Sequence, residues 1–207
     1  MRDWGRGVFV LSASSLLLLG VVAAAPARKP WFRGNTHTHT LWSDGDGAPE
    51  AVVAWYKEHG YQFLVLSDHN ILAEGDKWVP VLDEKGARLT PERLAKLVER
   101  FGNQVELREK DGRREMRLKR LEELRSGFEE AGKFLLIKGE EITDRFVEKP
   151  AGGTGKAIEH PIHHNALNLV NLIKAPGGGS VREVLERVVR AVEEEAARCG
   201  RPVLVHL

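Results

Sequence analysis

An α/β fold is the class that this sequence predicts, and two observations support the prediction. Short apolar runs alternate along the chain with amphipathic stretches of helical length. The runs 63–66 (FLVL) and 134–137 (FLLI) also lack the polar alternation of a strand with one exposed face. Strands of parallel sheets are covered on both faces and therefore read as continuous apolar runs. We expect a mainly parallel sheet whose strands are joined through helices.

The first half of the domain is expected to contain two strands and two helices. Pro49 suits the first turn of a helix, and Gly60 is placed where that helix would stop. Pro91 opens a second helix in the same way. The predicted strands are 32–37 and 62–67, and the predicted helices are 48–59 and 90–100, with an irregular segment at 71–90.

The second half is expected to begin with a β-hairpin. Asp111-Gly112 separates the segments 105–109 and 113–119, and Asp-Gly suits the left-handed residues of a tight hairpin turn. The stretch 145–159 is rich in Gly, Lys and Pro, which indicates a loop. The other predicted elements are helices at 121–131 and 181–199 and strands at 134–138, 163–169 and 202–205.

Residues 1–27 are expected to be a signal peptide, and residues 28–207 to form the domain. Arg2 and Arg6 give a basic start, the stretch 8–25 is apolar apart from Ser and Gly, and cleavage is expected after Ala25 or Ala27. We therefore expect export to the periplasm or the extracellular space. An uncleaved membrane anchor is the alternative, because the apolar stretch is near the short limit for spanning a bilayer.

Charge and cysteine content narrow the classes of function. The chain has 31 basic and 30 acidic side chains, and this near neutrality argues against binding nucleic acid mainly through charge. The single Cys199 cannot form an internal disulfide, which is compatible with export. We expect no nucleic-acid partner, and membrane contact only through an uncleaved leader.

Residues of metal-binding types follow several predicted strands. His37 and His39 are two residues apart, so on an extended strand both imidazoles face the same way. Apolar runs also lead to His69, to Glu140-Glu141, to His163-His164 and to His206. Imidazole nitrogens and carboxylate oxygens are common ligands of zinc and related metals. A lone H-x-H pattern also fits a solvated strand tip, but its recurrence with other donors predicts a metal site.

Four blocks of sequence form a recognisable family pattern. They are NTHTHT with SDGDG (35–47), FLVLSDHN (63–70), LLIKGEEIT (135–143) and PIHHNALNL (161–169). In this order they resemble the PHP family, the polymerase-and-histidinol-phosphatase group of metal-dependent phosphoesterases, over about residues 32–207. The resemblance implies a distorted TIM-like (β/α)7 barrel with the hairpin as an insertion. It also implies a trinuclear metal site at the carboxyl ends of the strands, where barrel enzymes place their chemistry.

The first two blocks supply four of the implied metal ligands. By resemblance, His37 and His39 bind one metal together with a bridging carboxylate. Asp44 and His69 are implied to hold a separate ion. Asp46 lies nearby, but its expected role is in the turn.

The later blocks imply the bridging carboxylate and a further histidine. The family pattern G-x-E, followed by an aliphatic and a small hydroxyl residue, selects Glu141 over Glu140. The H-x-N-A-L pattern selects His163 over His164, and Glu141 and His163 are the residues implied in catalysis. His206 ends the last predicted strand and suits another ligand of the same metal, although no proline follows it as in the family.

Two further expectations concern support for the site and its completeness. Asp68 precedes His69 and is expected to face away from the metal, as support for the ligands or as a helix cap. In the family, further strands bring a histidine-proline motif and a late aspartate-x-histidine pair, and neither follows His164 in this sequence. We therefore interpret the chain as truncated relative to the family, and His206 stays open as a ligand.

The implied activity is hydrolysis of a phosphoester, with a metal-activated water as the nucleophile. The ligand set accepts up to three divalent ions of Zn, Mn or Fe, and a small phosphorylated molecule is the expected substrate. Two alternatives stay open. One is a metal-dependent hydrolase of amidohydrolase type, for which Lys138 lies nearest to the glutamates. The other is a secreted metal-binding domain without catalysis.

Overall fold

The structure, a computed structural model, describes residues 31–148 and 156–207. The predicted signal peptide lies outside these residues, as does the middle of the predicted loop at 145–159. From Phe32 to Leu207 the described residues belong to one unit. In that unit they form two β-sheets, four α-helices and a short 3-10 helix, Gly102–Gln104.

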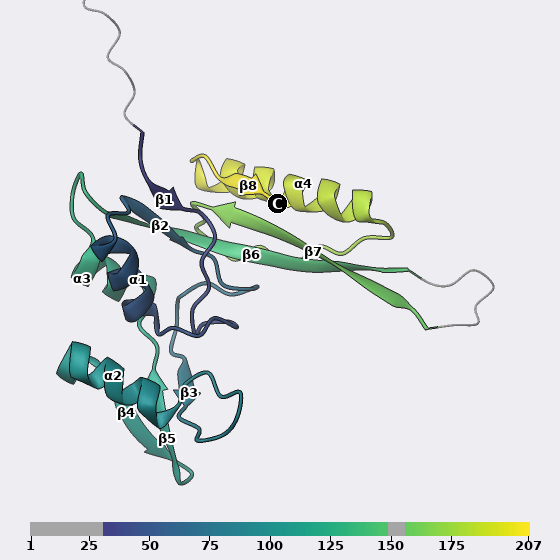
Figure 1. The fold of residues 1–207 in the computed structure, drawn as a ribbon. Coiled ribbons are helices and arrows are strands. Elements are labelled where there is room, and N and C mark those ends of the chain that lie inside the picture. Colours follow the sequence, from purple (N-terminus) through teal and green to yellow (C-terminus); the bar gives the residue numbers. More distant parts are fainter. Residues whose placement is uncertain (1–30, 149–155) are drawn as a thin grey trace, which may run out of the picture. The chain divides into compact units, whose positions relative to one another are not determined.

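A five-stranded sheet forms the larger part of the fold (Figure 1). In spatial order its strands are β1 Gly34–Asn35, β2 Phe63–Leu66, β6 Leu135–Glu148, β7 Ile158–Leu167 and β8 Leu204–His206. The pairs β1–β2 and β2–β6 are parallel, whereas the pairs β6–β7 and β7–β8 are antiparallel. The sheet is therefore mixed and not mainly parallel, because β7 runs antiparallel to β6 and β8 runs antiparallel to β7.

The long pairing of β6 with β7 corrects the predicted loop at 145–159. The ladder extends from Gly139 opposite Leu167 to Glu148 opposite Ile158, so both described ends of that stretch are strand. Polar residues pair across the two strands, as His160 does with Glu148 at 2.9 Å. Such cross-strand pairs allow a charged sequence to continue a ladder, and composition alone therefore gave the wrong assignment.

A three-stranded sheet contains the predicted hairpin. Its strands are, in spatial order, β3 Trp78–Pro80, β5 Arg113–Arg117 and β4 Leu107–Lys110. The hairpin prediction is confirmed: β4 and β5 are antiparallel, and Asp111 and Gly112 at the turn both have positive φ. Strand β3 lies in the segment that was predicted to be irregular.

The four predicted helices are confirmed, and their ends differ from the predicted ones by at most a few residues. They are α1 Pro49–Glu58, α2 Pro91–Phe101, α3 Leu121–Phe128 and α4 Val181–Cys199. Side chains at the expected positions cap two of them, because Thr90 accepts from the Arg93 amide and Ser180 from the Glu183 amide. Helix α4 packs against β6 and β7 through a buried cluster that includes Val184, Val188 and Ile142.

The predicted barrel is wrong. A (β/α)7 barrel of the expected type needs about seven helices, but the described residues contain four α-helices. The larger sheet is a curled five-stranded half-barrel, and the other three strands form a separate small sheet. The physical reason is that β6, β7 and β8 follow one another as antiparallel neighbours, whereas each parallel barrel strand needs its own crossover helix. Among the described residues, no helix combines the length and the apolar character needed to cross a membrane.

Candidate metal centre

The candidate site forms where four separate segments meet on one face of the larger sheet. These segments are the loop after β1, the residues after β2, the middle of β6 and the middle of β7. They bring six potential ligands into three overlapping groups, namely His37–His39–Glu141, His39–Asp44–His69 and His69–Glu141–His163. Within each group the three ligand atoms lie within 4.8 Å of one another.

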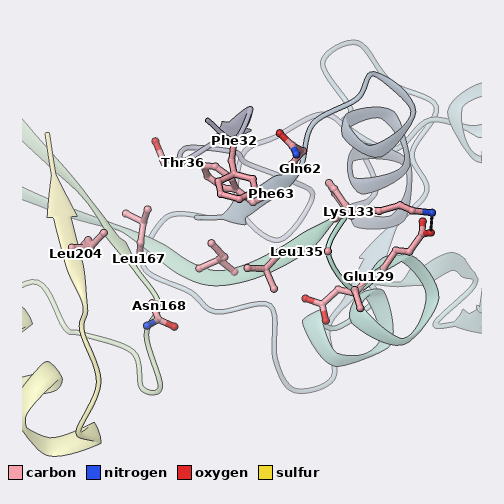
Figure 2. A pocket seen from close by; sticks show the side chains of 15 residues that line it. Phe32, Thr36, Gln62, Phe63, Glu129, Lys133, Leu135, Leu167, Asn168 and Leu204 are labelled. Carbon is pink, nitrogen blue, oxygen red and sulfur yellow. Dashed lines mark hydrogen bonds and ion pairs between the residues drawn. The ribbon is translucent and has the colours of Figure 1, made fainter. Parts of the chain in front are cut away.

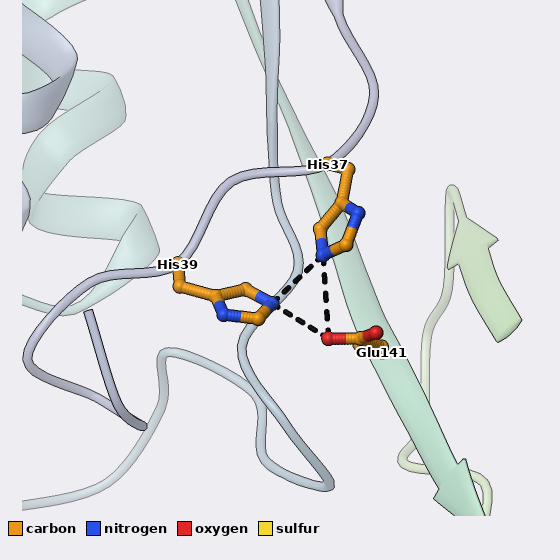
Figure 3. Close-up of side chains that lie close together, drawn as sticks. All are labelled: His37, His39 and Glu141. Carbon is orange, nitrogen blue, oxygen red and sulfur yellow. Dashed lines mark hydrogen bonds and ion pairs between the residues drawn. The ribbon is translucent and has the colours of Figure 1, made fainter. Parts of the chain in front are cut away.

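Glu141 is the central residue of this cluster and is only 3% exposed. Its Oε2 atom lies 3.3 Å from Nε2 of His37 and 2.6 Å from Nε2 of His39 (Figure 3). The same oxygen is 3.1 Å from Nδ1 of His69, and Oε1 is 2.7 Å from Nδ1 of His163. One buried carboxylate therefore contacts four imidazoles.

Asp44 supplies a second carboxylate on the other side of His39. Its Oδ1 atom is 2.8 Å from Nδ1 of His39, and its Oδ2 atom is 3.4 Å from Nε2 of His69. His39 thus lies between two carboxylates, one on each ring nitrogen. Asp44 is mostly exposed, so the cluster extends from the buried Glu141 to the surface.

The neighbouring histidines offset the effect of desolvation on the pKa of both carboxylates. Burial by itself raises the pKa of Glu141, but His69 and His37 outweigh it, and the pKa lies below its ordinary value. The pKa of Asp44 is lowered in the same way, with His69 and His39 outweighing a desolvation effect of the opposite sign. Both groups are therefore held as carboxylates, the form that binds cations.

Buried Asp68 holds the loop that carries His39 and Asp44. Its Oδ1 atom accepts from the Thr40 amide at 2.8 Å, the Ser43 amide at 3.0 Å and the Ser43 hydroxyl at 2.6 Å. Its Oδ2 atom accepts from the Thr40 hydroxyl at 2.9 Å. The expectation that Asp68 supports the ligands agrees with this geometry. His37 and His39, however, lie in this loop after β1 and not on the predicted strand.

Three residues that sequence reasoning did not single out also shape the site. Gly45 passes so close to the loop that a Cβ atom would lie 2.6 Å from the backbone of His39. Asn70, with φ of 49°, exchanges two hydrogen bonds with the backbone of Thr143, which fixes the segment after β2 against β6. The Thr143 hydroxyl lies 2.5 Å from Nδ1 of His69. In the sequence, the glycine of SDGDG was the only signal for the role of Gly45, and the asparagine of SDHN was the only signal for the role of Asn70.

Strand alternation separates the two pairs of neighbouring candidates. In the ladder Glu141 is opposite Asn165 and Thr143 is opposite His163, so these side chains share a face. Glu140 and His164 point to the opposite face and are buried there. Glu140 accepts from the Ile173 amide at 2.9 Å, and burial raises its pKa to about 7.

The remaining candidates lie outside the cluster. His206 belongs to none of the three groups, and its Nδ1 atom is 3.0 Å from the carbonyl oxygen of Leu207. Asp46 is 3.4 Å from Arg93 on the surface. Lys138, the lysine considered for an amidohydrolase bridge, instead pairs with Glu74.

The donor chemistry of the cluster suits a divalent transition metal. Two ligands about 2.0 Å from a tetrahedral zinc ion are roughly 3.3 Å apart. The ligand atoms of His37, His39 and Glu141 are separated by 2.9, 2.6 and 3.3 Å. Imidazole nitrogens and carboxylate oxygens are ligand types that metal ions commonly bind in proteins. The described residues therefore include groups that could bind a metal ion.

Comparison of the chain with known proteins returned no match among protein-family models, curated proteins or solved structures.

Proposed function

We propose that this chain is a metal-dependent phosphoesterase that resembles the PHP family. One observation carries the proposal: Glu141 on β6 is buried and contacts His37, His39, His69 and His163, which come from three other segments of the chain. Three segments converging on one buried carboxylate indicate a functional site, because burying a charge costs free energy unless it is compensated. The sequence blocks that resemble the family supply the choice of phosphoester over other substrates.

The proposed cofactors are up to three ions of Zn, Mn or Fe. Each of the three ligand groups offers three side chains to one ion. His39, His69 and Glu141 each belong to two groups, so neighbouring ions would share ligands. Glu141 has one oxygen toward His37, His39 and His69 and the other toward His163, which suits a bridging role.

The protein residues define how a phosphate ester would approach. When bound, divalent cations stabilise negative charge on phosphoryl oxygens and lower the pKa of water. Glu141 closes the inner end of the cluster, whereas the side chains of His37, His163 and Asp44 reach solvent. The substrate phosphate would therefore enter from the side of these three residues. Thr143 orients His69 through its hydroxyl group and keeps one ring nitrogen in place.

The position of Lys138 favours this proposal over an amidohydrolase. An amidohydrolase of the expected type uses a lysine as the bridging group, but Lys138 contacts Glu74 and the carbonyl oxygen of Val170. It alternates with Glu141 on β6 and points to the other face of the sheet. A metal-binding domain without catalysis is the alternative that the experiment below separates.

The direct test is metal content together with turnover. The purified chain is stripped with a chelator, reloaded with Zn, Mn or Fe, and assayed on a chromogenic phosphomonoester and phosphodiester. We expect bound metal and metal-dependent hydrolysis of at least one ester. Asp44→Asn should reduce both, whereas Asp46→Asn, two residues away but outside the cluster, should change neither.

Each other outcome has a defined meaning. Bound metal without hydrolysis of either ester would leave a metal-binding domain. Absence of stoichiometric metal after reloading, in a chain that remains folded by circular dichroism, would contradict the proposed function altogether.

A further inference from the structure

An apolar groove lies on the larger sheet and has a volume of about 710 Å³. Apolar side chains from four strands line it, together with Phe32, which lies two residues before β1 (Figure 2). The strand residues are Phe63, Leu135, Ile137, Leu167 and Leu204. Its volume falls within the range of pockets that hold small organic ligands. Leu135 and Leu204 are 52% and 64% exposed, although leucine is a residue that folding normally buries.

The groove and the candidate metal centre lie on the same face of the sheet. Along β6, Leu135, Ile137 and Glu141 are an even number of residues apart, so their side chains point the same way. The parallel register places Phe63 beside Leu135, and the antiparallel register places Leu167 beside Gly139. The apolar and the metal-binding residues are therefore two parts of one surface.

The two parts are also adjacent. On β7, Leu167 of the groove is two residues from Asn165, which pairs with Glu141. Two residues of a strand span about 7 Å. In the loop after β1, Thr36 lines the groove and is followed directly by His37. A molecule a few ångströms long could thus contact both.

Local structure shapes the wall of the groove. Gly34 on β1 pairs with Phe63 on β2, and a Cβ atom at Gly34 would lie 2.1 Å from the Phe63 ring. The missing side chain lets the aromatic ring lie against the backbone of β1.

We infer that this groove binds the apolar chain of an amphiphilic phosphate ester whose phosphate lies at the candidate metal centre. The inference rests on the proposed function and names its substrate class. An apolar groove that continues into a candidate metal centre, whose bound cations would attract an anion, matches a molecule with an apolar tail and an anionic head. A small polar phosphate ester would leave the exposed leucines without a role.

The test is the dependence of binding on alkyl-chain length. Butyl-, hexyl- and octylphosphonate, which contain no ester bond to hydrolyse, are titrated below their micelle concentrations into the metal-loaded chain by calorimetry. We expect the affinity to rise roughly tenfold or more from butyl to octyl, because each fully buried methylene is worth about a fourfold gain and an open groove retains part of it. Leu135→Asp and Leu204→Asp should each reduce that rise to about threefold or less. Leu107→Asp, an exposed leucine of the small sheet, should keep the full rise.

An affinity that is independent of chain length would overturn the inference, as would a Leu135→Asp variant with the same rise as the original chain. The groove could instead be the contact between two copies of the chain. Sedimentation would then show a dimer that Leu135→Asp dissociates, and the affinity would not depend on alkyl-chain length. That result would also overturn the inference. Hydrolysis of a chromogenic ester without any chain-length effect leaves the proposed function in place. A chain-length effect without hydrolysis leaves the groove in place and removes the function.

Discussion

Two faces of the β6–β7 ladder carry the same residue types in opposite environments. On one face Glu141 contacts four histidines, and its pKa is lowered despite burial. On the other face Glu140 is fully buried beneath a layer that includes Ile173, and burial raises its pKa to about 7. The pKa values of adjacent glutamates on one strand are therefore shifted in opposite directions.

The histidines repeat this contrast. His163 reaches solvent beside Glu141, whereas His164 is buried on the other face, and burial lowers its pKa. Residue type alone does not distinguish the members of either pair. The alternation of the strand decides which member joins the ligand cluster and which joins the packed layer under α4.

The largest expected difference between the faces is in metal affinity. Glu141→Gln should weaken metal binding by more than about a hundredfold, because even the loss of outer-shell partners can reach that level. Glu140→Gln should leave metal affinity within about threefold. Calorimetric titration of both variants measures this contrast. Equal losses of metal affinity in the two variants would contradict the assignment of Glu141 as the ligand and Glu140 as a buried residue of the other face.

The second contrast concerns the free energy of unfolding as a function of pH, measured with a chelator present so that no metal is bound. The ordinary pKa of Glu140 is 4.5, and in the folded chain it is raised to about 7. Between these values the unfolded chain releases a proton that the folded chain retains. The free energy of unfolding should therefore fall from this source as the pH rises from 4.5 to 7, by at most about 3 kcal/mol.

Glu140→Gln checks this sign, because glutamine mimics the protonated carboxyl group and does not titrate. Urea unfolding at pH 5 and pH 8 should show a smaller fall in stability for the variant than for the original chain. An identical difference between the two pH values in both proteins would contradict the raised pKa.

The third contrast separates the histidines. His163→Ala should weaken metal binding by about 10- to 100-fold while the fold is retained. His164→Ala should keep metal affinity but lower the free energy of unfolding by about 1–3 kcal/mol, because it removes a buried, packed side chain. Reversed effects would place the strand one residue out of register.

The smallest expected effect concerns support of the loop. Asp68→Asn replaces an acceptor of four hydrogen bonds, so the loop carrying His39 and Asp44 should lose part of its order. We expect a roughly tenfold loss of metal affinity, with Asp46→Asn in the same loop as the control. An unchanged affinity for Asp68→Asn would show that the ligands need no such support.

The elements with strong local signals could be predicted from the sequence. Pro49, Pro91 and Ser180 mark the starts of helices α1, α2 and α4, and Asp111-Gly112 marks the hairpin turn. In contrast, the direction of β7 has no local signal. A strand that begins at His163 reads the same in a parallel or an antiparallel arrangement, so its pairing with β6 had to come from the structure.

For the site, residue types and spacing predicted which side chains to examine. Six of the seven ligand candidates meet in the cluster, and His206 does not. Periodicity could not exclude His206, because it lies opposite Asn165 on the ligand face. Its ring contacts the carbonyl oxygen of Leu207 and not the ligand cluster, and the sequence does not reveal this placement. The role of Gly45 depends on contact with the backbone of His39, which spacing along the chain does not reveal.

The most direct measurement of the central claim is anomalous diffraction from crystals of the zinc- or manganese-loaded chain. The account predicts at least one anomalous peak within about 2.0–2.3 Å of a Glu141 carboxylate oxygen and of the nitrogens of His37 and His39. Loaded crystals without a peak at Glu141, or with the ion bound at Glu140 and His164, would contradict it.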